Sequence, residues 1–183
     1  MHVIAFNGSP RPRGNTWALL GEILRGAANA GATVEEIVLN KLNIRPCQAC
    51  DSCRKSLHCR FEDDMQPLYD KLLAADAIVI GTPIYFWSMS AQMKAFVDRW
   101  YALDLDPIRP RLVNKRLALA CAYADSTAET ASGAVFAFRS AAEYLGIRFY
   151  EPLLVTAADP GDAARNPLAM QAAFTLGVTV ATP

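Results

Sequence analysis

The chain has 183 residues, of which 52% are hydrophobic and 20% are charged, and lysine plus arginine equals aspartate plus glutamate at 18 each. This composition indicates one globular domain over residues 1–183, and it excludes a disordered chain or one whose overall charge attracts nucleic acid or an anionic membrane. Because no basic leader with a long apolar run and no bilayer-length apolar segment is recognisable, we expect a cytoplasmic protein with no membrane partner.

Residues 2–19 read as a strand, a loop and the first turns of a helix. The apolar residues 3–6 predict a buried strand, because a turn rich in Gly and Pro follows them. Apolar spacing predicts an amphipathic helix over residues 16–29, and Thr16 would be its N-cap if the loop were an ordinary βα connection. The first N–H groups of a helix and its dipole attract anions, so this loop favours a phosphate over an ordinary βα connection. The candidate phosphate-binding residues are Ser9, Arg11, Arg13, Asn15 and Thr16.

A cysteine-rich loop follows the second predicted strand, residues 33–39. Residues 40–64 show no clean period, and a loop of this length in a compact domain is usually functional. The part at about 43–64 holds four of the five cysteines in the spacing C-x2-C-x2-C-x5-C: Cys47, Cys50, Cys53 and Cys59. Four thiolates can hold a [4Fe–4S] cluster, whereas zinc sites usually take two CxxC pairs that lie farther apart. The spacing therefore favours a cluster over zinc or free thiols, and this cysteine usage favours a reducing compartment.

The rest of the chain alternates between predicted helices and strands. Apolar spacing predicts helices over residues 65–74, 90–101, 129–145 and 168–176 and strands over residues 77–80, 117–123 and 148–155. Apolar strands that alternate with helices predict an α/β fold: a flavodoxin-like, doubly wound, five-stranded parallel sheet with helices on both faces. Ligands of such sheets bind outside the carboxyl ends of the strands. We therefore expect the loops at residues 9–15, 83–89 and 124–132 to converge.

The loop after the central strand contains three consecutive aromatic residues, Tyr85, Phe86 and Trp87. They could pack on a neighbouring helix or cover a dimer interface, since large aromatic side chains are mostly buried. They could equally form the flat wall of a pocket, with Pro83 holding the backbone in an extended turn. A phosphate loop on the same sheet favours the pocket.

Two motifs carry a resemblance to a known family. GSPRPRGNT at residues 8–16 and TPIYFWSMSAQMKAFVDR at residues 82–99 resemble the flavodoxin-fold family of NAD(P)H-dependent FMN reductases and iron–sulfur flavoproteins. The resemblance implies that FMN binds with its phosphate at the first motif and its ring along the second. The residues facing the flavin would be Pro83, Ile84, Tyr85 and Phe86. The cysteine spacing also matches the compact motif of the iron–sulfur flavoproteins, which implies a [4Fe–4S] cluster.

The resemblance implies an FMN-dependent electron-transfer oxidoreductase with a [4Fe–4S] cluster. NAD(P)H or a reduced ferredoxin could donate electrons, and a quinone, an oxygen species or another protein could accept them. No catalytic acid or base is expected, because the redox chemistry belongs to the cofactors. A homodimer or homotetramer is expected to bring the two centres together. The alternatives are an NAD(P)H-dependent FMN or quinone reductase without a cluster, and a zinc-stabilised interaction module.

Overall fold

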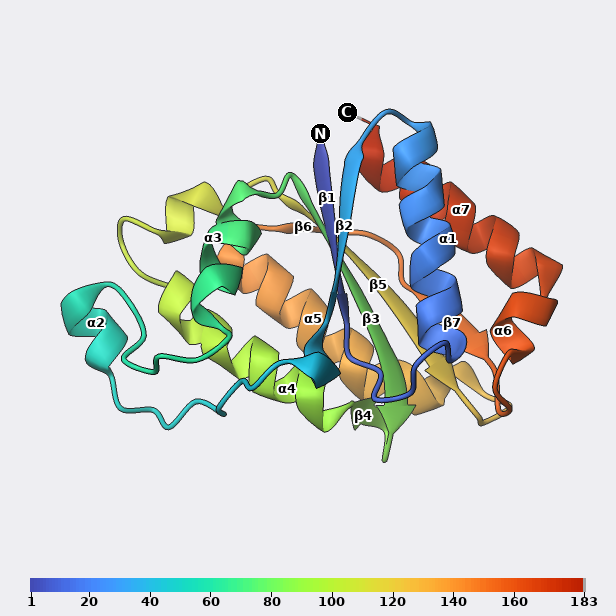
Figure 1. The fold of residues 1–183 in the computed structure, drawn as a ribbon, viewed down its shortest axis with the longest axis horizontal. Helices are drawn as coiled ribbons and strands as arrows, with labels where there is room; N and C mark the ends of the chain where they lie inside the picture. The colour runs from blue at the N-terminus through green and yellow to red at the C-terminus, as the bar shows by residue number, and fades with distance from the viewer. Residues whose placement is uncertain (183) are drawn as a thin grey trace.

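A mostly parallel sheet lies between two layers of helices in the computed structural model, which describes residues 1–182 (Figure 1). The strands are β1 (His2–Asn7), β2 (Thr33–Val38), β3 (Ala77–Tyr85), β4 (Ser88–Met89), β5 (Arg116–Tyr123), β6 (Arg148–Phe149) and β7 (Leu153–Thr156). The helices are α1 (Asn15–Asn29), α2 (Ser52–Ser56), α3 (Gln66–Ala74), α4 (Ala91–Asp98), α5 (Ser132–Leu145), α6 (Asp162–Arg165) and α7 (Pro167–Ala181). Short 3-10 helices are η1 (Leu39–Lys41), η2 (Arg99–Leu103), η3 (Arg109–Arg111) and η4 (Ala128–Ala131).

The strand order confirms the flavodoxin-like, doubly wound sheet. Neighbouring strands run β2-β1-β3-β5-β6, and β7 also pairs with β5 in the parallel direction. The sheet has seven strands rather than the expected five for two reasons. The expected last strand is split into β6 and β7 around Pro152, which has no N–H group to give to a ladder. The short β4 turns back against the end of β3 as an antiparallel hairpin.

Alternating side chains of the strands build a core on each face of the sheet. Ile4 and Phe6 of β1 face the layer formed by α3, α4 and α5, whereas Val3 and Ala5 face α1 and α7. Figure 1 shows these two groups of helices on opposite sides of the sheet. Both faces are therefore covered, and the loops at the ends of the strands remain for function.

Helices α1 and α7 pack so closely that glycine is required at their crossing. A Cβ atom on Gly26 would lie 2.1 Å from the carbonyl oxygen of Phe174, and one on Gly177 would lie 1.9 Å from that of Ile23. Helix α1 itself begins at Asn15, with Gly14 at the N-cap position, and not at an N-capping Thr16. Thr16 is buried in the first turn.

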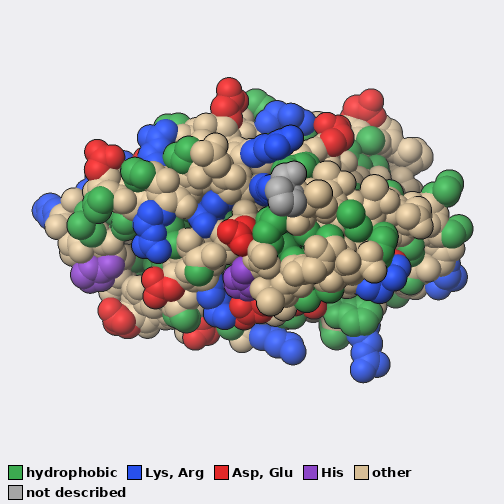
Figure 2. Space-filling model, turned by 90° about the horizontal axis from the view of Figure 1, so that it is seen from above, with side chains coloured by type: hydrophobic (Ala, Val, Ile, Leu, Met, Phe, Trp, Pro, Cys, Tyr) green, Lys and Arg blue, Asp and Glu red, His purple; other side chains and the backbone are tan. Residues whose placement is uncertain are grey.

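The surface carries charges of both signs. Figure 2 shows Lys and Arg interspersed with Asp and Glu on the face seen from above. That face therefore offers no continuous basic area of the kind that attracts nucleic acid. Among residues 1–182, no helix combines the length and apolar character needed to cross a bilayer.

Candidate functional site

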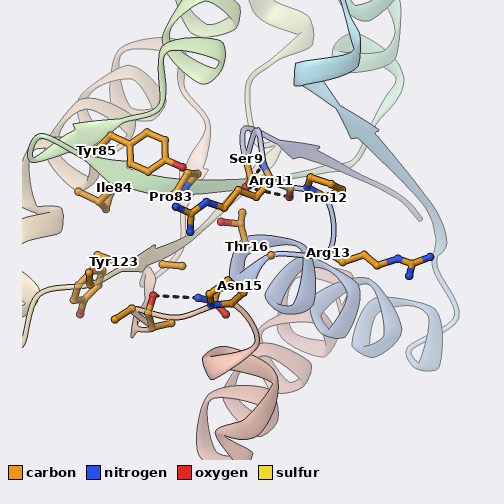
Figure 3. Close-up of a pocket in the computed structure, with 16 residues that line it drawn as sticks. Ser9, Arg11, Pro12, Arg13, Asn15, Thr16, Pro83, Ile84, Tyr85 and Tyr123 are labelled. Atoms are coloured by element: carbon orange, nitrogen blue, oxygen red, sulfur yellow. Dashed lines mark hydrogen bonds between the residues drawn. The ribbon is translucent and has the colours of Figure 1, made fainter.

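A pocket of about 450 Å3 opens at the carboxyl ends of β1, β3, β5 and β7 (Figure 3). Its lining consists of residues 11–16, 83–85 and 122–124 together with Ser9, Ala157, Ala158 and Pro160. The switch point of the sheet lies between β1 and β3, where the chain reverses its direction of travel across the sheet. The pocket thus brings together the predicted phosphate loop and the predicted ring loop.

The loop between β1 and α1 is held in shape by its own side chains. The backbone N–H of Ser9 donates to Asn7 Oδ1 at 2.9 Å, and that of Arg11 donates to Ser9 Oγ at 3.2 Å. Ser90 Oγ, at the N-cap of α4, donates to the carbonyl of Gly8 at 2.7 Å. A Cβ atom on Gly8 would lie 2.9 Å from Met93 Cβ, so only glycine fits against α4 here. These contacts direct the N-terminus of α1 into the pocket.

The two arginines of this loop point in different directions. Figure 3 shows the Arg11 side chain extending across the pocket towards Pro83 and Tyr85. Arg13 has a positive φ of 53°, and its guanidinium group extends away from the pocket (Figure 3). Only Arg11 therefore places its charge over the space that a ligand would fill.

Asn15 has a structural role that the sequence did not indicate. Its amide donates to the carbonyls of Ala157 and Asp159 at 3.0 and 2.9 Å. Its Oδ1 accepts from the N–H groups of Gly161 and Ala163 at 3.0 and 3.2 Å. The side chain, a candidate phosphate ligand that lines the pocket, ties the segment after β7 to the start of α1. The backbone N–H at the helix start is what Asn15 offers to an anion.

The ring loop divides between the pocket and the surface. Pro83, Ile84 and Tyr85, which are predicted to face the flavin, line the pocket. Phe86 does not line it: Phe86 and Trp87 form the tip of the β3–β4 hairpin and are 94% and 62% exposed. Both have positive φ angles, of 46° and 59°, which is unusual for aromatic residues because such turns favour Asn and Gly.

Two further walls of the pocket are formed by the end of β5 and by the segment after β7, whose side chains are mostly small and apolar. Of the predicted third loop, residues 124–132, only Ala124 lines the pocket, and Ala122 and Tyr123 precede it on β5. Ala157, Ala158 and Pro160 after β7 were not predicted, because small apolar side chains carry no functional group. Their position at the carboxyl end of a parallel strand was the signal that could have found them.

The four clustered cysteines line a second, much smaller cavity. Cys47, Cys50, Cys53 and Cys59 surround a space of about 20 Å3, which holds roughly one water molecule. Cys53 is buried in α2, whereas Cys47 and Cys50 are exposed. Within residues 1–182, no group of three or more Cys, His, Asp or Glu side chains is arranged so that it could hold a metal ion. The donor set suits a four-thiolate centre, but the cysteines would have to rearrange to hold one.

The environments of two of these thiols differ. A hydrogen bond between Cys50 Sγ and Ser52 Oγ, at 3.5 Å, lowers the pKa of Cys50. Burial raises the pKa of Cys53. The fifth cysteine, Cys121, lies in β5, outside the cysteine loop. It is buried, and burial raises its pKa to about 12. It belongs to the core.

A buried ion pair fixes the end of the cysteine loop. Arg99 bonds through Nη1 to Asp63 Oδ2 at 2.7 Å, and both side chains are almost fully buried. Asp63 also accepts from the N–H groups of Arg45 and Met65, at 3.0 and 3.1 Å. Although burial opposes it, the hydrogen bond from Arg99 holds the pKa of Asp63 below its usual value. Arg99 lines the cysteine cavity, which the sequence did not indicate because this residue lies 40 positions after Cys59.

The comparisons with known proteins place the chain among flavin-dependent proteins. A family model described as NADPH-dependent FMN reductase matches residues 1–157. An iron–sulfur flavoprotein of Methanocaldococcus jannaschii is 40% identical over 99 residues, which is 54% of this chain and 51% of that protein. The match to this relative and to similar ones thus spans about half of their length.

Other similarities extend over the whole chain at lower identity. A Bacillus subtilis protein whose name describes an NAD(P)H-dependent FMN-containing oxidoreductase is 26% identical over 181 residues, 96% of each chain. The structure of an NAD(P)H:quinone oxidoreductase from Methanothermobacter marburgensis superposes with a TM-score of 0.81 at 18% identity, covering 100% of this chain and 97% of that one. At this identity, the superposition shows a shared fold.

Proposed function

Because the chain belongs to the NADPH-dependent FMN reductase family, a family of flavin-dependent oxidoreductases, we propose that it binds FMN in the pocket at the end of the sheet. The observation that carries this proposal is a helix N-terminus and a flat wall facing one cavity. The N-terminus of α1, with Arg11 beside it, suits a phosphate group. Pro83, Ile84 and Tyr85 suit one side of a planar ring, and the volume of about 450 Å3 is typical of small-molecule sites.

Bound FMN would accept electrons in pairs and release them singly, and the residues of the chain would bind and orient it. NAD(P)H is the donor that the family description favours. A reduced ferredoxin is a second candidate donor, and a quinone or an oxygen species is a candidate acceptor.

We further propose that Cys47, Cys50, Cys53 and Cys59 hold a [4Fe–4S] cluster. The support is threefold: the compact spacing, one cavity lined by all four thiols, and similarity to proteins named iron–sulfur flavoproteins. The cysteines are not arranged to hold a metal ion in this structure, so the loop must rearrange to admit a cluster. Residues 43–51 carry two of the thiols and form neither helix nor strand, so this part of the loop can rearrange without breaking a regular element.

The two proposed centres lie in different parts of the chain, which favours a homodimer or homotetramer. Figure 1 shows α2 and the cysteine loop at one end of the molecule, well away from β4 and the start of α1, where the pocket opens. Electron transfer requires centres that lie close together, so a second copy would have to bring its cluster to this pocket. The exposed tip formed by Phe86 and Trp87 lies beside the pocket and is the surface that we expect this copy to cover.

The decisive experiment is an anaerobic preparation of the full chain assayed for FMN, iron, acid-labile sulfide and zinc. One FMN with about four iron and four sulfide per chain is the expected result. FMN without iron would contradict the cluster and leave an NAD(P)H-dependent FMN or quinone reductase, which the small cavity favours as the second candidate. A colourless protein with one zinc would contradict both and leave an interaction module.

A further inference from the structure

Arg99 places a buried positive charge against the cavity of the four cysteines. It is 1% exposed, and it lines this cavity together with Phe61 and Tyr69. A buried guanidinium group requires a paired carboxylate, and Asp63 supplies it. The contacts run from Nη1 to Oδ2 at 2.7 Å and from Nη2 to Oδ1 at 3.2 Å.

One nitrogen of this guanidinium group has no hydrogen-bond partner. Nη1 bonds to Asp63 and to the carbonyl of Arg45, and Nη2 bonds to Asp63. Nε is buried and has no hydrogen-bond partner among the described residues 1–182. A buried N–H group without an acceptor is unfavourable, and nearly all such groups in proteins are paired. Because Arg99 lines the cavity, an acceptor bound there could satisfy the unpaired Nε–H donor.

The other cations near the cavity are open to water. Arg45 and Arg60 stack over the ring of Phe61, with guanidinium carbons 4.3 and 5.3 Å from its centroid, and both are exposed. Arg54 stacks on the ring of Tyr101, and its side chain is 47% exposed. Water and salt weaken the fields of these groups. Arg99 is shielded from water, so its field, which the paired Asp63 partly offsets, is screened least at the cavity.

Building on the cluster of the proposed function, we propose that Arg99 is the hydrogen-bond donor and buried cation that stabilises the reduced state of the metal centre at the four cysteines. A cluster held by these cysteines would accept one electron at a time, and each electron would make its charge more negative by one unit. Arg99 stays protonated, and no bond to it forms or breaks. Net charge and hydrogen bonds to sulfur are among the factors that set the potential of such centres, so Arg99 raises it.

The test compares Arg99→Gln and Arg99→Lys with the wild-type protein and with Arg116→Lys. Arg116 is a matched control: it is half-buried, donates to the carbonyl of Val180 at 2.8 Å, and lies at the start of β5, outside both cavities. Each full chain is prepared anaerobically and assayed for FMN, iron and sulfide. The midpoint potential of the centre is then measured by a redox titration followed by electron paramagnetic resonance.

Arg99→Gln is expected to shift the one-electron equilibrium of the centre towards the oxidised state by about tenfold, which corresponds to a potential lower by about 59 mV. Arg99→Lys keeps a charge opposite Asp63 but lacks Nε, so it is expected to fold and to shift the potential in the same direction by a smaller amount. Arg116→Lys should leave the potential unchanged.

Three results would overturn the proposal, and they are distinguishable. An iron-free wild type would refute the cluster itself and with it the role of Arg99. A loaded wild type whose potential equals that of both Arg99 variants would refute only the role of Arg99. Loss of iron from both variants with FMN retained would show that Arg99 serves the folding of the loop alone.

Discussion

Arg11 and Arg13 carry the same charge in the same loop, yet they differ in direction. The Arg11 side chain extends over the pocket, whereas that of Arg13 extends away from it (Figure 3). Because the two side chains carry the same charge, comparing their variants separates the effect of side-chain direction on ligand binding from the effect of net charge.

Arg11→Ala should weaken FMN binding by about 1.5–3 kcal/mol, which is the scale of a hydrogen bond to a charged group. Arg13→Ala removes the same charge but no contact across the pocket, so its effect should be smaller. Titration of the flavin-free protein with FMN, followed by flavin fluorescence, measures both. Equal losses in the two variants would show that net charge, and not the position of Arg11, governs binding.

The buried carboxylate of Asp63 should contribute measurably to the free energy of unfolding. Its side chain is 2% exposed and pairs with Arg99, so Asp63→Asn leaves a buried charge without its partner. Such losses cost about 3–5 kcal/mol of the free energy of unfolding. Asp70→Asn on the exposed side of α3 is the control and should change stability by less than about 0.5 kcal/mol.

The pH dependence of stability should identify the same carboxylate. Its pKa is lowered in the folded state, so its stabilisation is complete above the unfolded-state pKa of about 3.9 and is lost as the pH falls through the folded value. Urea unfolding between pH 5 and pH 3 should therefore show a flatter loss of stability in Asp63→Asn than in the wild type. Parallel curves would mean that Asp63 ionises in the folded protein as it does in the unfolded chain.

At the scale of elements, α1 contains two glycines in opposite surroundings. Gly26 meets the backbone of α7 at its crossing point, whereas nothing lies within 4 Å of a Cβ atom built on Gly21. Alanine favours helix formation over glycine by about 1 kcal/mol at either position. A difference in stability between the two alanine variants should therefore come from the space available for the new methyl group.

Gly26→Ala should lower the free energy of unfolding by about 1–3 kcal/mol, because the new methyl group would push α1 and α7 apart. Gly21→Ala should be neutral or stabilise by up to about 1 kcal/mol. Chemical denaturation of both variants gives the comparison. If Gly26→Ala were as stable as Gly21→Ala, the close crossing of the two helices would be wrong.

At the scale of the whole molecule, the hairpin tip bears on assembly. Phe86 and Trp87 adopt a backbone conformation that costs about 1–3 kcal/mol for each such residue unless the surroundings enforce it. A turn of this kind favours Asn followed by Gly. Strained and exposed aromatic side chains beside a pocket are therefore better explained by contact with another chain than by the stability of one chain.

Phe86→Asn combined with Trp87→Gly should relieve the turn and convert the expected dimer or tetramer into smaller species. Analytical ultracentrifugation at micromolar concentration measures the mass. Leu168→Asn removes an exposed apolar side chain from α7, in the other helical layer, and should leave the mass unchanged. A wild-type monomer, or a double variant that keeps the wild-type mass, would contradict the proposed interface.

Periodicity was sufficient to predict the architecture, because buried parallel strands are continuous apolar runs. Residues 77–80 and 117–123 are such runs, and they became the centre of the sheet in β3 and β5. The split of the last strand depends on Pro152 and not on apolar pattern, so the prediction merged β6 with β7.

The site could be predicted only where side-chain chemistry is concentrated in sequence. The predicted phosphate loop and the first three residues of the predicted ring loop line the pocket for that reason. The walls at Ala122 and Ala157 have no distinctive chemistry, and the direction of a side chain, as for Arg13, depends on backbone angles that composition does not reveal. Arg99 joins the cysteines only through tertiary packing.

The amide of Asn15 links parts of the chain that ribosomes make at different times. Its four hydrogen bonds reach residues 142 to 148 positions later, across almost the whole length of the protein. Contacts of such high sequence separation form late, because the intervening chain must first be brought together. During synthesis the loop after β1 emerges early, but the wall at residues 157–160 emerges more than 140 residues later. Any ligand held between these two segments therefore reports that the chain has folded from its first strand to its last, and ligand retention can serve as a quality check on each preparation.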